Sequence, residues 1–529
     1  MKFINHKTKT FLSVVLLTGT LFSCSEDTMD SINADHDNPH NVDAKFILTD
    51  AITATAYSNI GGDFNHYFSS YVENEVGIFN QLFNAETRKA DIYSSTTFSN
   101  VWNNLYSTLK NARIVVSKCS DEGTQPGNYA TKGMGEILAA INAGLITDAF
   151  GDAPFSQAAL AELNNGKPQF MNPELDKQED IYKDIIKYLD DAIVDLPKGD
   201  NHGSGSPTVN DLLYKGDTSK WLKLAYGLKA RYTMHLLNVT SDKQAALKEI
   251  VDYCNKSFTN TDEEAAFNVY DGNTNVNPGY DFFTSREYLA ASESLSQKLI
   301  ERNDPRMHRA FVTALGADED ISGDCRQITG QEDKLFFMAP NGAPEQRQEH
   351  YNTSIFGMAS TASTFLMSYH EVLFLKVEAL VRLERKDEAK ETLKKAVIAG
   401  LLNMEKSIKA ALNDPLVSVV SNGTDPITSE IAGEYFDTTI APLFDQNPLK
   451  ETMLQKYFAF WGANGESTEC YNDVRRLRSE GNDFYSFNNI GKFPLRCPYG
   501  NDDVTSNPNV KAAYGNGQYV LTDNVWWAK

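Results

Sequence analysis

The sequence is short of positive charge, and this shortage narrows the classes of partner. It has 49 Lys and Arg against 71 Asp and Glu, which gives a formal net charge of −22. A nucleic-acid backbone is bound by clustered Lys and Arg side chains, and no long basic run occurs, so we expect no nucleic-acid partner. The acidic balance instead suits a secreted, soluble body and a neutral ligand.

Cysteine is also scarce, with 6 residues in a chain of 529. One of them, Cys24, follows an N-terminal apolar run, and the other five are widely spaced with no CxxC pair. This spacing indicates neither a zinc site nor a dense disulfide framework. Because five is an odd number, at least one thiol should be free. A bridge between Cys470 and Cys497 is compatible with the sequence, which does not decide it.

Patterns of known catalytic or nucleotide-binding sites are incomplete wherever they begin. His370-Glu371 starts like the zinc-binding helix of a metalloprotease, but Phe374 stands where the second His belongs. The glycines at 133 and 135 lack the third glycine and the preceding strand of a nucleotide-binding loop. Paired carboxylates carry no information in a chain with 71 acids. The sequence therefore predicts a protein that is not an enzyme and has no cofactor.

One acidic segment has part of the pattern of a calcium-binding loop. It places oxygen-bearing side chains at positions one, three and seven of such a loop, which are Asp318, Asp320 and Asp324. Position twelve is Thr329, where the loop needs a bidentate Glu. We therefore interpret the segment as a solvated acidic turn and keep calcium as the weaker alternative.

The N-terminus has the order of a secretory signal. Three lysines and no acid precede the apolar run 11–22, which is shorter than the ~20 residues that span a bilayer. The run ends in Leu-Phe-Ser-Cys24, which resembles a lipobox, a motif that is cleaved before its Cys and acylated there. A plain signal peptide beside an ordinary cysteine is the alternative. We expect residues 1–23 to be removed and Cys24 to carry the lipid.

The lipid predicts how the mature chain meets a membrane. Each buried methylene contributes about 0.8 kcal/mol, and two acyl chains already anchor a protein firmly. Residues 24–42 are polar and acidic, with too few apolar side chains to fold, and are predicted to be a tether. Residues 43–529 would then form a single ligand-binding body that contacts the membrane through the anchor only.

The apolar periodicity of the body is mainly helical. Apolar residues recur every three to four positions in the segments 180–196, 221–235, 245–256 and 372–383, and a further helix is expected from Glu388 after a tight turn. A helix, a short turn and a second helix with Ala at close contacts resemble a TPR-like unit, although the strict TPR consensus is absent. We predict a mainly α fold in which TPR-like helix pairs form a scaffold.

Two long segments, 261–361 and 412–529, are rich in Asn, Gly, Asp and aromatic residues and are expected to be irregular loop regions. Aromatic side chains in such loops either pack on the scaffold or serve as platforms for a ligand. Clusters that combine aromatic rings with planar polar groups occur at 64–83, 276–288 and 341–356. From these clusters we select as ligand-binding candidates Tyr67, Tyr71, Tyr280, Arg286 and Tyr351.

Several other motifs have structural interpretations. Residues 148–155 contain one Gly and one Pro and are predicted to form the turn that ends a helix. Glu371 and Glu378 lie on one helix face and are expected to pair with Arg or Lys of other helices. The two arginines at 475–476 are expected to form ion pairs. The tryptophans at 526–527 are expected to dock on the body or on a partner.

Seven segments, in the right order, resemble motifs of the SusD/RagB family of outer-membrane nutrient-binding lipoproteins. The second of them, with the sequence TDAFGDAPF, is similar to the hallmark turn of that family, and the spacing is most similar to its shorter SusD-like subgroup. The set spans most of the mature chain and is therefore more specific than any single motif. The segments are 102–113, 147–155, 221–231, 303–306, 369–379, 471–476 and 493–499.

The resemblance implies a fold, a partner and a cargo. It implies a TPR-based α fold placed over a SusC-like TonB-dependent transporter, to which captured oligosaccharides are delivered. The acids that follow Cys24 are similar to a surface-export signal of the same lineage, which implies an outer-membrane protein that faces the cell exterior. Two alternatives stay open: the same fold and partner with a peptide or protein-fragment cargo, and, less favoured, a surface glycoside hydrolase.

Overall fold

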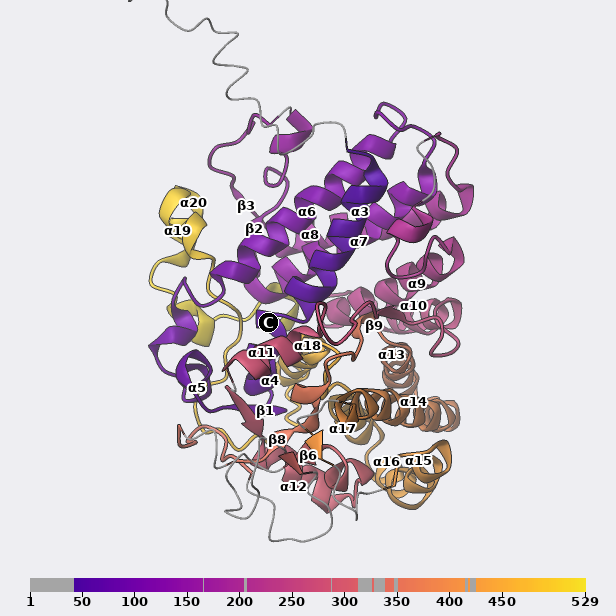
Figure 1. The fold of residues 1–529 in the computed structure, drawn as a ribbon, viewed down its shortest axis with the longest axis vertical. Coiled ribbons are helices and arrows are strands. Elements are labelled where there is room, and N and C mark those ends of the chain that lie inside the picture. Colours follow the sequence, from indigo (N-terminus) through magenta and orange to yellow (C-terminus); the bar gives the residue numbers. More distant parts are fainter. Residues whose placement is uncertain are drawn as a thin grey trace, which may run out of the picture. The chain divides into compact units, whose positions relative to one another are not determined.

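A computed structural model describes the chain in several stretches. Helices make up most of them and the strands are short, which confirms the mainly α fold (Figure 1). Residues 44–529 form one compact unit. The described residues are 42–164, 166–203, 207–286, 288–312, 326–327, 338–346, 351–413, 417–418 and 425–529.

The helices occur throughout the described chain. In its first half they are α3 (Ala44–Ala54), the π-helix η1 (Thr55–Ile60), α4 (Asp63–Tyr71), α5 (Asn80–Glu86), α6 (Ser99–Cys119), α7 (Tyr129–Phe150), α8 (Gln178–Asp195), α9 (Thr218–His235) and α10 (Lys243–Lys256). In its second half they are α11 (Pro278–Arg286), α12 (Glu293–Glu301), α13 (Tyr369–Arg382), α14 (Lys386–Leu412), α15 (Ser429–Tyr435), α16 (Ala441–Gln446), α17 (Pro448–Ala459), α18 (Ser467–Ser479), α19 (Asn501–Ser506) and α20 (Pro508–Tyr514).

The strands pair only two by two. Antiparallel pairs join β1 to β5, β2 to β3, β4 to β9 and β6 to β8, whereas β7 and β10 are parallel. Such pairs tie loops together and do not form a core sheet. The strands are β1 (Glu75–Gly77), β2 (Ala153–Pro154), β3 (Leu175–Asp176), β4 (Ala265–Phe267), β5 (Leu289–Ala291), β6 (Phe311–Val312), β7 (Arg326–Gln327), β8 (Thr353–Ser354), β9 (Thr364–Met367) and β10 (Val417–Ser418).

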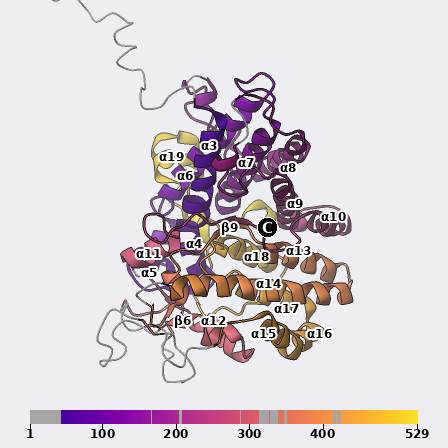
Figure 2. The same cartoon turned by 45° about the vertical axis from the view of Figure 1, so that its right-hand side comes forward.

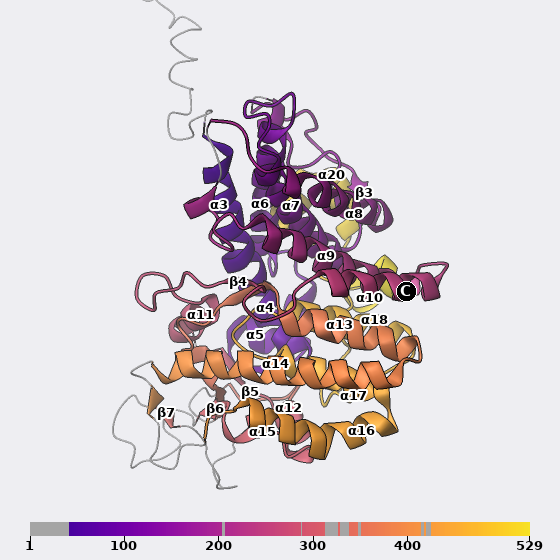
Figure 3. The ribbon, with the colours of Figure 1, turned by 90° about the vertical axis from the view of Figure 1, so that its right-hand side faces the viewer.

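Successive helices pack side by side to form the scaffold. The row runs from α6 through α7, α8, α9, α10 and α13 to α14, and each helix packs against the next (Figures 2 and 3). Their buried apolar side chains belong to one large core cluster. The predicted helix pair is α13 and α14, and its turn contains Glu384 with a left-handed φ of 61°. The TPR-like helix pairs are therefore confirmed.

Helix boundaries follow the sequence pattern well within this scaffold. The predicted helix 180–196 is α8, and its predicted apolar face is buried. Helix α9 begins after Asp217, whose side chain accepts a hydrogen bond from the backbone N–H of Ser219 at 3.0 Å and so caps the helix. Helix α14 begins two residues earlier than expected and extends to Leu412, because its apolar face continues along the whole length.

The expectation that residues 412–529 are irregular is wrong. Helices α15 to α20 all lie in this segment. Helix α17 is buried on every side from Glu451 to Ala459, so it shows no alternation of polar and apolar faces. Its polar members are paired inside the core, where Lys456 lies 2.7 Å from Asp473 of α18. The other helices, with the exception of α18, have only six or seven residues, too few for a helical period to show.

Ion pairs between helices are confirmed as the role of the two glutamates in α13. Glu371 receives two hydrogen bonds of 2.6 Å from Arg231 of α9, and Glu378 receives two of 2.7 Å from Arg476 of α18. Arg475 behaves differently from its neighbour. It forms no ion pair within the described residues, and its guanidinium lies 5.0 Å from the centre of the Trp527 ring.

The turn after α7 and the C-terminus meet in the core. Gly151 ends α7 with a φ of +79°, a conformation that glycine adopts without strain, and this confirms the predicted helix-ending turn. One turn earlier, the Asp148 carboxylate accepts hydrogen bonds from Tyr182 and, at 2.8 Å, from the indole of Trp527. Trp527 is fully buried, so the expected docking on the body is confirmed.

The four described cysteines are buried free thiols, and Cys470 and Cys497 are therefore not bridged. Burial raises the pKa of the Cys119 and Cys254 thiols to about 12, which makes them unreactive at neutral pH. Within the described residues, no helix is both long enough and apolar enough to cross a bilayer.

Candidate functional site

An open cleft of about 490 Å³ lies between α4 and α11, and we call it the α4–α11 cleft. Figures 1 and 3 show α11 beside α4. Residues of η1 and of the first two turns of α6 complete the walls. The lining residues are Tyr57, Ser58, Gly62, Asp63, His66, Asn100, Val101, Asn103, Asn104, Pro278, Asp281, Phe282, Ser285 and Arg286.

Two glycines between η1 and α4 allow close contacts, Gly61 with α11 and Gly62 with η1. A Cβ atom at Gly61 would lie 2.4 Å from Cγ of Pro278, the first residue of α11. A Cβ atom at Gly62 would lie 2.3 Å from the carbonyl oxygen of Ser58. Real Cβ atoms do not come this close to other atoms, so a side chain at Gly61 would displace α11, and one at Gly62 would distort the turn that follows η1.

A buried amide holds the first turn of α11 in place. Asn277 is fully buried, and its Nδ2 donates to the carbonyl oxygens of Ala362 at 2.9 Å and Ala463 at 3.1 Å. Its Oδ1 accepts from the backbone N–H of Gly279 at 2.8 Å. These bonds tie the start of α11 to two distant segments, so the cleft wall has a fixed position.

A histidine and a phenylalanine stack at the inner end of the cleft. The rings of His66 and Phe282 are nearly parallel, at an interplanar angle of 18° and a centroid distance of 3.9 Å. Burial, assisted by the positive charge of Arg286, lowers the pKa of His66 to about 3. The imidazole is therefore neutral at physiological pH and has one donor and one acceptor nitrogen. Neither nitrogen has a hydrogen-bond partner among the described residues.

Charged groups of both signs surround this stacked pair. Burial raises the pKa of Asp63, and Arg286 partly offsets that effect. The Tyr57 hydroxyl donates to Asp281 at 3.4 Å. The Arg286 guanidinium lies 5.7 Å from the centre of the Phe282 ring. The cleft thus combines aromatic faces, exposed amides from α6, a guanidinium and carboxylates, an arrangement suited to a polar ligand with some apolar surface.

The sequence-predicted ligand residues fall in different places. Arg286 lines the α4–α11 cleft, and Tyr280 lies half-buried on the same helix but does not line the cleft. Tyr67 and Tyr71 point into the core from α4, with 6% and 1% of their surface exposed. Tyr351 is half-buried against a small separate apolar cluster, and its hydroxyl accepts from the backbone N–H of Glu345 at 3.0 Å.

Other predicted residues lie outside the described part of the chain. These are the lipidation candidate Cys24 and the calcium candidates Asp318, Asp320 and Asp324. Within the described residues, no group of three or more His, Cys, Asp and Glu side chains is arranged to hold a metal ion.

Two of the sequence-predicted clusters contribute residues to the α4–α11 cleft, although the predicted tyrosines do not line it. The clusters 64–83 and 276–288 supply one wall each, through His66 and Phe282. A hydroxyl group tolerates water, which is why the sequence favours Tyr over Phe as an exposed platform. The amides Asn100 and Asn104 were not selected at all, although they stand one helical turn apart at the start of α6, which is a recognisable signal.

The mainly α fold and the open, mixed polar and aromatic α4–α11 cleft are features of a ligand-binding protein. A family model described as "Starch-binding associating with outer membrane" matches residues 36–496. A solved SusD/RagB family protein from Bacteroides thetaiotaomicron is 49% identical, with a TM-score of 0.86, and the match covers 92% of this chain and 99% of that one. This chain therefore belongs to the SusD-like family of outer-membrane nutrient-binding proteins.

More distant solved structures share the fold alone. A chitin-binding protein is 22% identical with a TM-score of 0.67, and the match covers 91% of this chain and 100% of that one. A SusD homologue from Bacteroides fragilis is 18% identical with a TM-score of 0.67, over 92% of this chain and 100% of that one. Comparison with curated proteins gave no match.

Proposed function

We propose that this chain is a surface lipoprotein that captures oligosaccharides in the α4–α11 cleft and delivers them to a SusC-like TonB-dependent transporter. One observation carries the proposal. Two segments more than 200 residues apart bring an aromatic face, a guanidinium and carboxylates into one open cleft. Membership of the SusD-like family supports the transporter as partner and the outer membrane as location.

The chemistry of the cleft matches that of a sugar. The C–H face of a sugar ring packs on aromatic rings such as Phe282 and Tyr57, which are partly exposed. Its hydroxyl groups both donate and accept, as does the exposed amide of Asn104. Asp281 accepts hydrogen bonds from hydroxyls.

The anchor and the tether follow from the N-terminal sequence. We propose that Cys24 carries the lipid, that residues 24–42 act as a tether and that residues 43–529 are the ligand-binding body. The acids after Cys24 support a position facing the cell exterior. A lid role over the transporter would then place captured sugar directly above the transport channel.

Titration of the body with oligosaccharides and peptides tests the proposal. Isothermal titration of residues 43–529 should show saturable binding of at least one oligosaccharide. Phe282→Ala and Arg286→Ala should each weaken it about tenfold, because each removes a contact of roughly 1 to 1.5 kcal/mol. The matched controls are Phe46→Ala, whose ring is 51% exposed on α3, and Arg385→Ala, which lies in the α13–α14 turn. Both controls should bind as the unchanged body does.

Three results would count against the proposal. Binding of peptides with no response to sugars would show that the cargo is a peptide and not an oligosaccharide. Sugar binding that neither cleft variant weakens would move the site elsewhere. Release of shorter sugars from an oligosaccharide by the pure protein would favour the hydrolase alternative, in which Asp63 and Asp281 would be the first acids to replace with Asn.

A further inference from the structure

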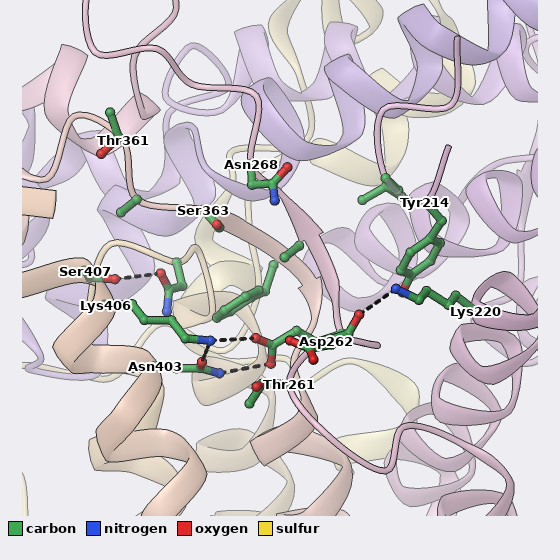
Figure 4. Close-up of a pocket in the computed structure, with 16 residues that line it drawn as sticks. Tyr214, Lys220, Thr261, Asp262, Asn268, Thr361, Ser363, Asn403, Lys406 and Ser407 are labelled. Carbon is green, nitrogen blue, oxygen red and sulfur yellow. Dashed lines mark hydrogen bonds and ion pairs between the residues drawn. The ribbon is translucent and has the colours of Figure 1, made fainter. Parts of the chain in front are cut away.

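A second cleft, of about 410 Å³, lies between β4, β9, the first turn of α9 and the helix α14, and we call it the α9–α14 cleft (Figure 4). It shares no lining residue with the α4–α11 cleft. Its lining residues are Leu213, Tyr214, Lys220, Thr261, Asp262, Glu264, Ala266, Asn268, Thr361, Ala362, Ser363, Phe365, Asn403, Lys406, Ser407 and Asn464.

A strand pair forms the floor of this cleft. In the antiparallel pairing of β4 and β9, Ala266 lies opposite Phe365, and both residues line the cavity. Phe365 is 6% exposed, so only part of its ring faces the cavity, and the neighbouring alanines leave the hollow above it. The backbone N–H of Phe365 donates to the carbonyl oxygen of Asn464 at 2.9 Å, which fixes the far wall to the floor.

A buried carboxylate is held rigidly on one side of the hollow. Oε2 of Glu264 accepts from the backbone N–H of Tyr369 at 3.1 Å and from Nδ2 of Asn403 at 3.0 Å. Nζ of Lys406 donates to Oδ1 of Asn403 at 3.0 Å and lies 3.9 Å from Oε1 of Glu264 (Figure 4). Burial raises the pKa of Glu264. Nδ1 of His370 lies 3.3 Å from Nδ2 of Asn403 and helps to fix the orientation of this amide. The group is therefore preorganised to meet a ligand.

Other polar groups remain for a ligand on the remaining walls. The Ser407 hydroxyl donates to Oδ1 of the buried Asn464 at 3.1 Å. The NH₂ group of Asn464 is then left to donate to a ligand. Asn268 and Ser363 have no hydrogen-bond partner in the described parts of the chain, and Figure 4 shows them across the hollow from Asn403 and Lys406. Donors and acceptors thus converge from at least three directions.

The formal charges in the lining cancel. The positive charges of Lys220 and Lys406 balance the negative charges of Asp262 and Glu264. Nζ of Lys220 also donates to the backbone carbonyl oxygen of Asp262 at 2.8 Å. A phosphate or other strong anion would approach the buried carboxylate, and a cation would approach two ammonium groups, so neither is favoured. A neutral ligand with many hydroxyl groups satisfies amides, hydroxyls and a carboxylate together, because each hydroxyl both donates and accepts.

We propose that the α9–α14 cleft is a second binding site, for one neutral sugar ring, and that it is independent of the α4–α11 cleft. A protein with two such sites holds a long glycan at two points, or retains a free monosaccharide beside the captured chain. Binding at two linked points strengthens attachment to a long glycan beyond either site alone, without any new contact.

Titration of monosaccharides followed by ligand-observed NMR tests the second site. The probes are free neutral hexoses, pentoses and N-acetylhexosamines, with free amino acids as a comparison, added to residues 43–529. We expect saturable binding of at least one sugar. Asn268→Trp should weaken it about tenfold or more, because the indole fills the hollow and an amide is lost. Val269→Trp is the matched control, because Val269 is exposed next to Asn268 but does not line the cleft.

The Arg286→Ala variant separates this proposal from the proposed function. Monosaccharide binding that persists in Arg286→Ala and is lost in Asn268→Trp supports the second site, whether or not the α4–α11 cleft binds oligosaccharides. The proposal is overturned if no monosaccharide binds saturably, if Asn268→Trp and Val269→Trp bind alike, or if Arg286→Ala alone abolishes the signal. Binding of amino acids without any sugar response overturns the sugar assignment.

Discussion

Replacing Arg476 with Met tests the buried ion-pair network that joins α13 to α18. The guanidinium is fully buried, makes two 2.7 Å hydrogen bonds to the carboxylate of Glu378 and reaches Asp473 at 3.0 Å. Burial alone would raise the pKa of Glu378, but Arg476 and Arg382 outweigh it and hold the pKa at about 2. Met has a similar length and no charge, so the substitution removes the partner without opening a large cavity.

The size of the effect follows from what remains around the two carboxylates. Removing one partner of a buried ion pair costs about 3–5 kcal/mol of unfolding free energy, because a charge is left in a dry environment. Arg382 still donates to Glu378 at 2.9 Å, and Lys456 still lies 2.7 Å from Asp473. These two contacts limit the damage, so we expect a loss near the lower end, about 3 kcal/mol.

Urea unfolding followed by circular dichroism and tryptophan fluorescence measures this loss. Arg385→Met is the control, since its pair with Glu388 is about half exposed on both sides and should be worth less than about 0.5 kcal/mol. The double variant Arg476→Met with Glu378→Leu should regain much of the stability, because it removes the stranded charge. A loss below about 1 kcal/mol for Arg476→Met, or a double variant no more stable than the single one, would refute the reasoning.

Two further predictions concern a buried histidine and a glycine. Burial lowers the pKa of His235, but the carboxylates of Glu469 and Asp148 outweigh that effect and raise the pKa from 6.5 to about 9. The protonated imidazole therefore stabilises the fold by on the order of 3 kcal/mol below pH 6.5. This stabilisation is lost as the pH rises through 9. The difference in melting temperature between the unchanged protein and His235→Gln should therefore be large at pH 6 and small at pH 10, and an equal difference at both would contradict the assignment. Gly61→Val should move α11 outward and weaken oligosaccharide binding in titration more than Gly203→Val, whose site is open, and equal binding would show that the glycine does not position the wall.

The helices that can be predicted from the sequence are those with one solvent-exposed and one buried face. Helices α8 and α9 have such faces, and their apolar stripes are recognisable in the sequence. Helix α17 was missed because it is buried all round, and its Glu451 and Lys456 look like solvent-facing residues until their buried partners are known. Pairing partners from distant segments cannot be read from local periodicity.

The candidate site was predictable as a set of segments but not as a set of side chains. Arg286, one of the sequence-predicted ligand residues, lines the α4–α11 cleft. Tyr67 and Tyr71 are four residues apart on α4 and share the face that packs on the core, whereas His66, beside Tyr67, borders the cleft. Which face of α4 is covered depends on the position of α11 and α18, which follows from tertiary packing and not from the sequence of α4.

The structure of the body with a bound oligosaccharide, chosen by titration, tests the proposed capture role most directly. We predict that a sugar ring lies in the α4–α11 cleft, packed on Phe282 and hydrogen-bonded to Arg286. A bound oligosaccharide that leaves this cleft empty, or that lies only against another surface of the body, would contradict the proposal.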